Sequence, residues 1–196
     1  MITIECRQGD DIWHKSRCGI PTASNFDLIL TSKGKPSKSR KKYLYRLAGE
    51  RILGTPEESY QNIAMIQGTE MESEARNFYE IVNGVEVAQV GFCLVDGFGS
   101  SPDGLVGEKG GLEIKCPTLA AHVEYLLDNI FPISYFQQVQ GNLLVTGREW
   151  WDFCSYYPGM KPLIIRVERD EKFLKALKIE LEIFVSELEE TVKKLI

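Results

Sequence analysis

The chain reads Ser101-Pro-Asp-Gly-Leu-Val-Gly-Glu-Lys-Gly-Gly-Leu-Glu-Ile-Lys-Cys-Pro117 near its middle, and this segment predicts a β-hairpin around which the fold is built. Its second strand alternates two apolar residues with Glu113 and Lys115, so the apolar pair faces a core and the charged pair faces the other side. Glycines in the intervening turn would fold the segment back and bring Asp103 toward Glu113. Two carboxylates and a lysine are therefore expected to converge.

Such a cluster suits metal-assisted hydrolysis of a phosphodiester. Mg²⁺ prefers oxygen ligands, commonly one or two carboxylates together with water and phosphate oxygens. Asp103 and Glu113 are the candidate ligands, with the backbone carbonyl of Ile114 as a third. Lys115 is charged and is expected instead to orient or activate the attacking water, or to balance charge on phosphorus. A bare Glu-x-Lys is also typical of a plain surface hairpin, and the Pro-Asp-Gly turn upstream is what favours the metal site.

The hairpin is one of several motifs that follow one another along the chain. Its Pro-Asp and Glu-Ile-Lys elements resemble the core of the PD-(D/E)XK nuclease superfamily. The wider set resembles the phage lambda exonuclease (YqaJ-like viral recombinase) branch of that superfamily. The matching segments are Gln8–Gly19, Thr22–Ser24, Gln67–Gly68 with Glu72 and Ala75–Arg76, Ser101–Leu105, Gly111–Pro117, Gln138–Gln140 and Glu168–Lys172.

The resemblance implies an α/β fold of restriction-endonuclease type, with a mixed central sheet of about five strands flanked by helices, in a single domain spanning residues 1–196. It further implies a Mg²⁺-dependent exonuclease, with Mn²⁺ as an alternative ion. The enzyme would degrade one strand of linear double-stranded DNA 5′ to 3′ and leave a 3′ overhang for phage-type recombination. A homotrimer and a single-strand annealing partner are implied in the same way.

Four further site residues come from the resemblance. It assigns Arg17 and Ser24 to a pocket for the terminal 5′-phosphate of DNA, Glu72 to a place beside the metal, and Gln138 to the active site. From the residues alone, Ser24 is a helix cap and Arg17 a surface charge. A helix start at Pro21–Ser24 would nevertheless offer backbone N–H groups to a phosphate.

Two other functions remain open from the sequence. A PD-(D/E)XK endonuclease would use the same Asp103, Glu113 and Lys115 but would need a surface that reads bases, and no additional module is evident. A catalytically silent DNA-binding or assembly protein of this fold would be expected to lack an acidic ligand or the lysine. An iron–sulfur nuclease is excluded because it needs a cysteine cluster.

Charge is distributed unevenly along the chain. The net charge is −5, yet the segment 33–46 holds seven basic residues and no acidic residue. The remainder has 16 basic residues against 28 acidic ones. This basic run predicts contacts with the DNA backbone, and the alternative is a solvated loop and helix face. The candidate contacts are Lys33, Lys35, Lys41 and Lys42.

Composition bounds the remaining possibilities. A chain of 196 residues suits one domain with a sizeable core. Five scattered cysteines without a Cys-x-x-Cys pair predict reduced core thiols, and Trp13 is also assigned to the core. Neither a membrane-spanning run nor a signal peptide is apparent, so a soluble protein of the bacterial cytoplasm is expected.

Hydrophobic periodicity and breaker residues predict the other elements. The last helix is expected to be a lid on the sheet or a subunit contact. Asp96 is expected in a turn, and Gln140 is left without a role. Helices are predicted at Asn25–Leu30, from Ser37 or Ser39 to Leu53, Glu58–Val82, Pro117–Asn129, Ile133–Leu144 and Asp170–Leu195, and strands at Val85–Val95, Trp150–Tyr157 and Leu163–Glu168.

Overall fold

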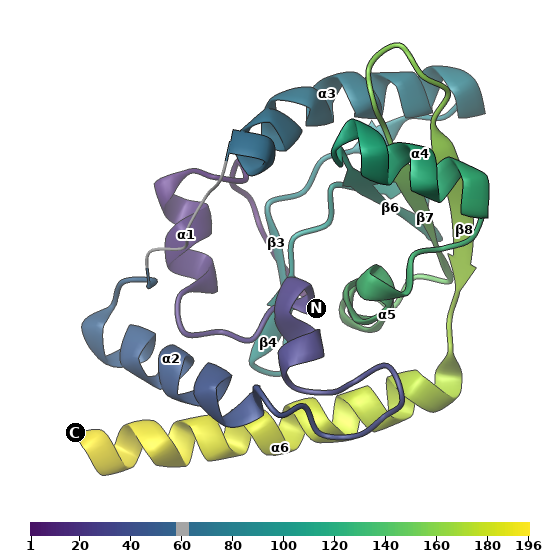
Figure 1. Ribbon diagram of the computed structural model, residues 1–196. Coiled ribbons are helices and arrows are strands. Elements are labelled where there is room, and N and C mark those ends of the chain that lie inside the picture. Colours follow the sequence, from purple (N-terminus) through teal and green to yellow (C-terminus); the bar gives the residue numbers. More distant parts are fainter. Residues whose placement is uncertain (58–62) are drawn as a thin grey trace.

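The protein is a mixed α/β structure whose largest sheet has five strands (Figure 1). The computed structural model describes residues 1–57 and 63–196. The five strands lie in the order β2-β5-β6-β7-β8, with β6 and β7 parallel and all other neighbours antiparallel. Their bounds are Val87–Ala88 (β2), Gly104–Val106 (β5), Gly110–Lys115 (β6), Trp150–Ser155 (β7) and Leu163–Glu168 (β8).

The expected hairpin is formed by β5 and β6, and β6 is the middle strand of this sheet. Leu112 is fully buried on one face, and Glu113 is equally buried on the other. Glycine is required beside the next strand, because a Cβ on Gly111 would lie 2.2 Å from the ring of Trp151. The sheet prediction is thereby confirmed, together with the expected strands in the C-terminal half.

A second sheet of three antiparallel strands was not expected. It contains β1 (Ile2–Ile4), β3 (Phe92–Val95) and β4 (Phe98–Ser100). The single strand predicted at Val85–Val95 is wrong, because its two halves, β2 and β3, belong to different sheets. Gly91 lies where the chain passes between the sheets, and a Cβ there would lie 2.4 Å from Cys6 Sγ. The predicted link after Asp96 forms β4, while Asp96 itself has a φ of 49° and turns the chain.

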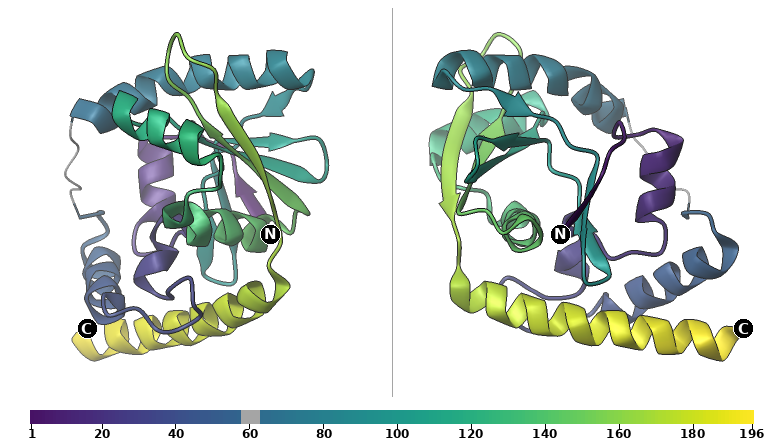
Figure 2. Two further views of the ribbon diagram at one scale, coloured as in Figure 1. Left: turned by 45° about the vertical axis from the view of Figure 1, so that its right-hand side comes forward. Right: turned by 180° about the vertical axis from the view of Figure 1, so that it is seen from behind.

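Helices cover both faces of the five-stranded sheet (Figure 2). Helix α3 (Ile63–Asn83) packs on the face of Leu112 and Ile114 through buried Ala75 and Tyr79. Its expected beginning at Glu58 lies outside the described residues. The opposite face carries α4 (Leu119–Asp128) and α5 (Phe136–Thr146), the latter preceded by the 3₁₀ turn η2 (Ile133–Tyr135). The charged side of β6 therefore faces α5.

A separate core joins the N-terminal third of the chain to the last helix. It contains apolar residues from η1 (Ala23–Leu28), α2 (Arg40–Leu53), the small sheet and α6 (Glu171–Leu195). Arg40 of α2 donates to Glu180 and Glu187 of α6 at 2.8 and 2.6 Å. The apolar stripe of α6 thus lies inside the chain, where it packs against α2 and the small sheet rather than over the five-stranded sheet. Figure 1 shows α6 running beneath α2 at the bottom of the view.

The cysteines are free thiols, and two of them, Cys93 and Cys154, are fully buried. Burial raises the pKa of Cys154 to about 12 and that of Cys116 to about 11, so both thiols stay protonated at neutral pH. Among the described residues, none of the helices is both long and apolar enough to span a bilayer.

Candidate active site

The three predicted hairpin residues lie together at the open end of β5 and β6. The carboxylate of Glu113 is fully buried and accepts a hydrogen bond from Lys115 Nζ at 2.6 Å. Asp103 directly precedes β5, and its Oδ2 accepts from the backbone N–H of Ile114 at 2.6 Å. Lys115 Nζ also lies 5.2 Å from the ring centre of Tyr135. The structure therefore places two carboxylates around one ammonium group.

The charges of these groups are strongly coupled. Burial raises the pKa of Asp103 well above its ordinary value, and the nearby Glu113 carboxylate raises it further. Burial alone would lower the pKa of Lys115, but Glu113 and Asp103 outweigh this effect and raise it. Two buried carboxylates that repel each other would be stabilised by a bound cation. The donor set, all oxygen, fits a hard ion such as Mg²⁺.

The third expected ligand, the carbonyl of Ile114, lies on the same edge of β6 as Asp103. In a strand, the N–H and C=O groups of one residue point to the same side, and the Ile114 N–H points at Asp103. The next carbonyl, that of Lys115, points the other way and accepts from Tyr156 N at 2.9 Å. No cluster of three or more acidic, histidine or cysteine side chains suited to a metal occurs in the described part of the chain. A metal here would thus depend on backbone and water oxygens beyond the two carboxylates.

Helix α3 contributes Glu72 and Arg76 from one face. Arg76 is buried, donates from Nε to the backbone carbonyl of Asp103 at 3.1 Å, and forms an ion pair with Glu72 four residues earlier. Burial raises the pKa of Glu72, and the charge of Arg76 opposes this shift. Glu72 is therefore an acid close to the pocket, as the sequence predicts, and Arg76 links it to the backbone that carries Asp103.

Helix α5 contributes two amides. Gln138 Nε2 donates to Glu113 Oε1 at 2.5 Å, and Asn142 Nδ2 donates to Glu113 Oε2 at 3.0 Å. Sequence reasoning named Gln138 and missed Asn142. The available signal was the four-residue spacing of the two amides, which places both on one helix face. Gln140 points elsewhere, because its amide bonds the backbone of Glu168 and Asp170 where β8 meets α6.

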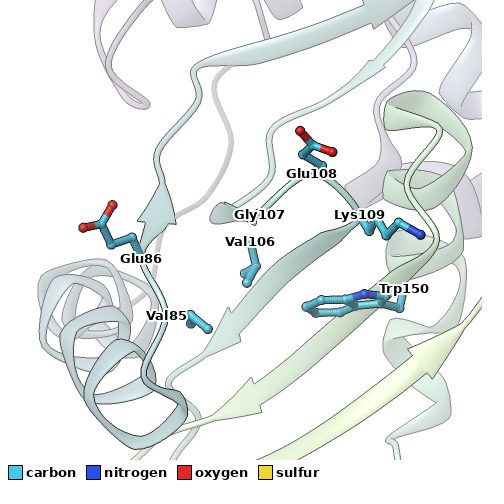
Figure 3. A pocket seen from close by; sticks show the side chains of 7 residues that line it. All are labelled: Val85, Glu86, Val106, Gly107, Glu108, Lys109 and Trp150. Atoms are coloured by element: carbon cyan, nitrogen blue, oxygen red, sulfur yellow. The ribbon is translucent and has the colours of Figure 1, made fainter.

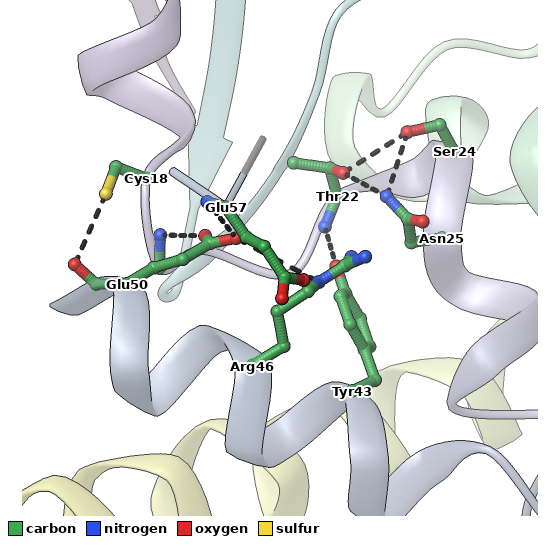
Figure 4. A network of polar contacts seen from close by, with 9 residues as sticks. Cys18, Thr22, Ser24, Asn25, Tyr43, Arg46, Glu50 and Glu57 are labelled. Atoms are coloured by element: carbon green, nitrogen blue, oxygen red, sulfur yellow. Dashed lines mark hydrogen bonds and ion pairs between the residues drawn. The ribbon is translucent and has the colours of Figure 1, made fainter. Parts of the chain in front are cut away.

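A hollow with a volume of about 420 Å³ lies between α1 (Asp11–Arg17), η1 and α2. Figure 4 shows the polar contacts among some of the residues that line it. Arg17 lines it and donates to Ser101 Oγ at 2.7 Å, and Trp13 Nε1 donates to the same oxygen at 2.9 Å. Ser101 stands two residues before Asp103, so only a very short piece of chain separates the contacts of Arg17 from the candidate metal ligands. Burial lowers the pKa of Arg17 to about 10, which leaves it charged at neutral pH.

Trp13 is therefore a wall of this hollow rather than a core residue. Its ring lies 4.1 Å from the guanidinium carbon of Arg17, which is stacked on it. The two are four residues apart on α1, and this spacing was the signal for the pair. Ser101 begins the segment Ser101–Leu105 that resembles the family, and the sequence predicts no role for it.

Ser24 lies at the rim of the hollow, in an exposed position. Its Oγ is 3.3 Å from Thr22 Oγ1 and 3.4 Å from Asn25 Nδ2, and both neighbours line the hollow. The helix expected here is η1, and it is a six-residue 3₁₀ helix. Such a short helix has little dipole, so a phosphate in this hollow would depend on side chains, chiefly Arg17.

The basic run divides into structural and exposed residues. Arg40 forms ion pairs with two glutamates of α6. The guanidinium carbon of Arg46 lies 4.8 Å from the ring centre of Tyr43. The four predicted DNA contacts, Lys33, Lys35, Lys41 and Lys42, are exposed on the loop before α2 and on its first turn.

Another hollow, of about 620 Å³, lies at the opposite end of the hairpin (Figure 3). Its walls include Val85, Val106, the turn residues Gly107–Lys109, and the ring of Trp150. The predicted site residues lie at the other, open end of β5 and β6. This hollow is thus separate from the candidate active site.

Comparison with known families identifies the same family that the sequence motifs resemble. A family model described as the YqaJ-like viral recombinase domain matches residues 12–149, which include every predicted site residue. The chain belongs to this family. A search of curated proteins finds no match.

Solved structures include two relatives of this YqaJ-like chain. The alkaline exonuclease LHK-Exo from Laribacter hongkongensis is 36% identical, with a TM-score of 0.86, and the match covers 95% of this chain and 96% of that one. The same values hold for LHK-Exo in complex with dAMP. A phage-related exonuclease from Haemophilus somnus, at 13% identity, has a TM-score of 0.71 over 90% of this chain and 96% of its own. The last comparison shows the shared fold alone.

Proposed function

We propose that this YqaJ-like protein is a Mg²⁺-dependent exonuclease that degrades one strand of linear duplex DNA from its 5′ end and leaves a 3′ overhang for recombination. The main observation behind this proposal is that Asp103, Glu113 and Lys115 converge. Asp103 lies two residues after Ser101, which accepts a hydrogen bond from Arg17 in the hollow. The similarity to LHK-Exo, an alkaline exonuclease, over nearly the whole chain supports the same activity. Mn²⁺ would serve as an alternative ion.

Each group then has a role. Asp103, Glu113 and the Ile114 carbonyl would hold the ion, which when bound would polarise the scissile phosphate and lower the pKa of an attacking water. Lys115, held by Glu113, would orient that water or stabilise charge on the phosphorus. Glu72 would hold a further water at the edge of the site. Arg17 and Ser24 would bind the terminal 5′-phosphate, so that the chain end fixes which bond is cut.

Assembly and partners belong to the same proposal. A homotrimer that encloses DNA, and a single-strand annealing protein that takes up the exposed 3′ strand, would suit a recombination exonuclease. Lys33, Lys35, Lys41 and Lys42 would contact the duplex backbone.

The test is digestion of linear duplex DNA with Mg²⁺ or with EDTA, comparing 5′-phosphate ends with 5′-hydroxyl ends and including a closed circle. We expect loss of linear DNA only with Mg²⁺, faster from phosphorylated ends, with the circle intact. Cleavage of the circle would instead indicate an endonuclease. DNA binding without any digestion would indicate a silent member of the fold.

Arg17→Ala tests the end pocket separately from the chemistry. We expect the variant to lose most of the preference for 5′-phosphorylated over 5′-hydroxyl ends, because the guanidinium of Arg17 lines the hollow and donates to Ser101. The rate on 5′-hydroxyl ends should change much less. An unchanged end preference would remove Arg17 from the pocket.

A further inference from the structure

We infer that Asn142 is a positioning residue that fixes the plane of the Glu113 carboxylate, and so fixes the lone-pair direction that is presented to a divalent cation. This inference rests on the proposed metal-dependent function. Its starting point is that Glu113 is held from two directions. Lys115 reaches it along its own strand, and Gln138 and Asn142 reach it from α5.

Counting acceptor positions shows what Asn142 contributes. An ionised carboxylate has about four lone-pair positions, two on each oxygen. Lys115 and Gln138 both donate to Oε1, and Asn142 donates to Oε2. The described donors therefore occupy Oε1 fully and Oε2 once. One position on Oε2 is left for a cation, and Asn142 is the donor that selects it.

The support behind Asn142 is rigid. Asn142 is 1% exposed, and its neighbours Val139 and Leu143 are fully buried against Trp151 on the sheet. An amide fixed in this way holds its partner without moving when a ligand binds. Without it, the carboxylate plane would be free to turn about its last bond, and the lone-pair direction offered to a cation would no longer be fixed, which would weaken cation binding.

Helix α5 offers a matched control for damage to the helix itself. Gln140 is also 1% exposed and makes two hydrogen bonds through its amide, to Glu168 O at 2.8 Å and from Asp170 N at 2.9 Å. Those bonds stabilise the connection between β8 and α6 and do not involve Glu113. Gln140→Leu should therefore reduce thermal stability as Asn142→Leu does, without changing the metal site.

The experiment measures Mn²⁺ binding by electron paramagnetic resonance, in the absence of DNA, for the wild type, Asn142→Leu, Asn142→Ser, Gln140→Leu and Asp103→Asn. Asn142→Ser is included in case the leucine variant does not fold, since the serine hydroxyl is too short to reach Glu113. We expect both Asn142 variants to bind Mn²⁺ about 10-fold more weakly or worse, the usual effect of losing a residue that orients a ligand. Gln140→Leu should bind as the wild type does.

Each other result has a definite meaning. Wild-type affinity in a folded Asn142 variant would overturn this inference and leave the proposed function intact. Equal weakening in Gln140→Leu would also overturn it, because the effect would then come from the helix as a whole. A wild type that binds no Mn²⁺, or binds it equally well as Asp103→Asn, would instead overturn the proposed metal site and this inference with it.

Discussion

Lys115 is the residue in which the conflict between burial and charge is sharpest. Burial of its ammonium disfavours the charged form and would lower the pKa of Lys115. The neighbouring carboxylates of Glu113 and Asp103 favour the charged form more strongly, so the lysine stays protonated. A lysine in this state is a fixed cation rather than a base. Its use is to stabilise negative charge that develops on a substrate.

Lys115→Ala is expected to reduce the cleavage rate by about 100- to 1000-fold or more, since a charged donor aimed at the reacting group is lost. DNA binding should be nearly unchanged, because the charge of Lys115 is already compensated by Glu113. Digestion rates and gel-shift titrations on the same duplex would measure the two effects. Lys109→Ala, at an exposed pair with Glu149, is the control that should cut normally.

Asp103→Asn is expected to stabilise the metal-free protein at neutral and alkaline pH. The pKa of Asp103 is raised in the folded state, so the native protein holds this proton more tightly than the unfolded chain does. Stability then falls as pH rises from the ordinary carboxyl range through the raised pKa. Thermal unfolding in EDTA across pH 4 to 9 should show this decline in the wild type and a weaker decline in the variant. Equal midpoints at pH 8 would contradict the prediction, and activity should be lost in any case.

At the scale of the elements, the β-hairpin was predictable and the amide contacts were not. The alternation in β6 and the glycines before it are local, and the strand follows from them. The contact between Asn142 and Glu113 joins residues 29 positions apart and depends on how α5 crosses the sheet. The small sheet was missed for a related reason, since Ile2–Ile4 pairs with Phe92–Val95 across most of the N-terminal half. Spacing along a chain does not report such pairings.

Helix α6 contributes to stability through an apolar stripe whose residues Leu177, Leu181, Phe184 and Leu188 are fully buried. Leu181→Ala should lower the free energy of unfolding by about 2–5 kcal/mol, because it opens a cavity between α6 and α2. Ile183→Ala, at a side chain 44% exposed on the same helix, should cost much less. Urea unfolding would give both values. A cost for Leu181→Ala no greater than that for Ile183→Ala would show that the stripe is not part of the core.

At the scale of the whole molecule, charge is separated rather than balanced. The exposed lysines of the basic run lie on one loop and the start of α2, while the rest of the chain is acidic. If the protein binds DNA as proposed, we expect this distribution to attract the duplex to one region and repel it from others. The total charge, which alone would argue against DNA binding, says little about this region.

Replacing Lys41 and Lys42 together with Gln should weaken DNA binding and make its logarithmic dependence on salt less steep by about one to two units, because fewer counterions are released. Fluorescence anisotropy on a short duplex at several salt concentrations would measure the slope. The matched control replaces Lys109 and Lys178, exposed lysines on the hairpin turn and on α6. An unchanged slope in the Lys41/Lys42 variant would mean that this run is only a solvated surface.

The packing of α6 on α2 also sets the order in which the molecule can be built during translation. Arg40 and its partner Glu180 are 140 residues apart, so α2 emerges from the ribosome long before the helix that covers it. All five strands of the larger sheet, together with α5, are synthesised in between and can pack together first. The wall that α2 gives to the Arg17 hollow is completed only after α6 has docked. A nascent chain would therefore hold the carboxylates of the hairpin in place before the hollow beside Arg17 is complete.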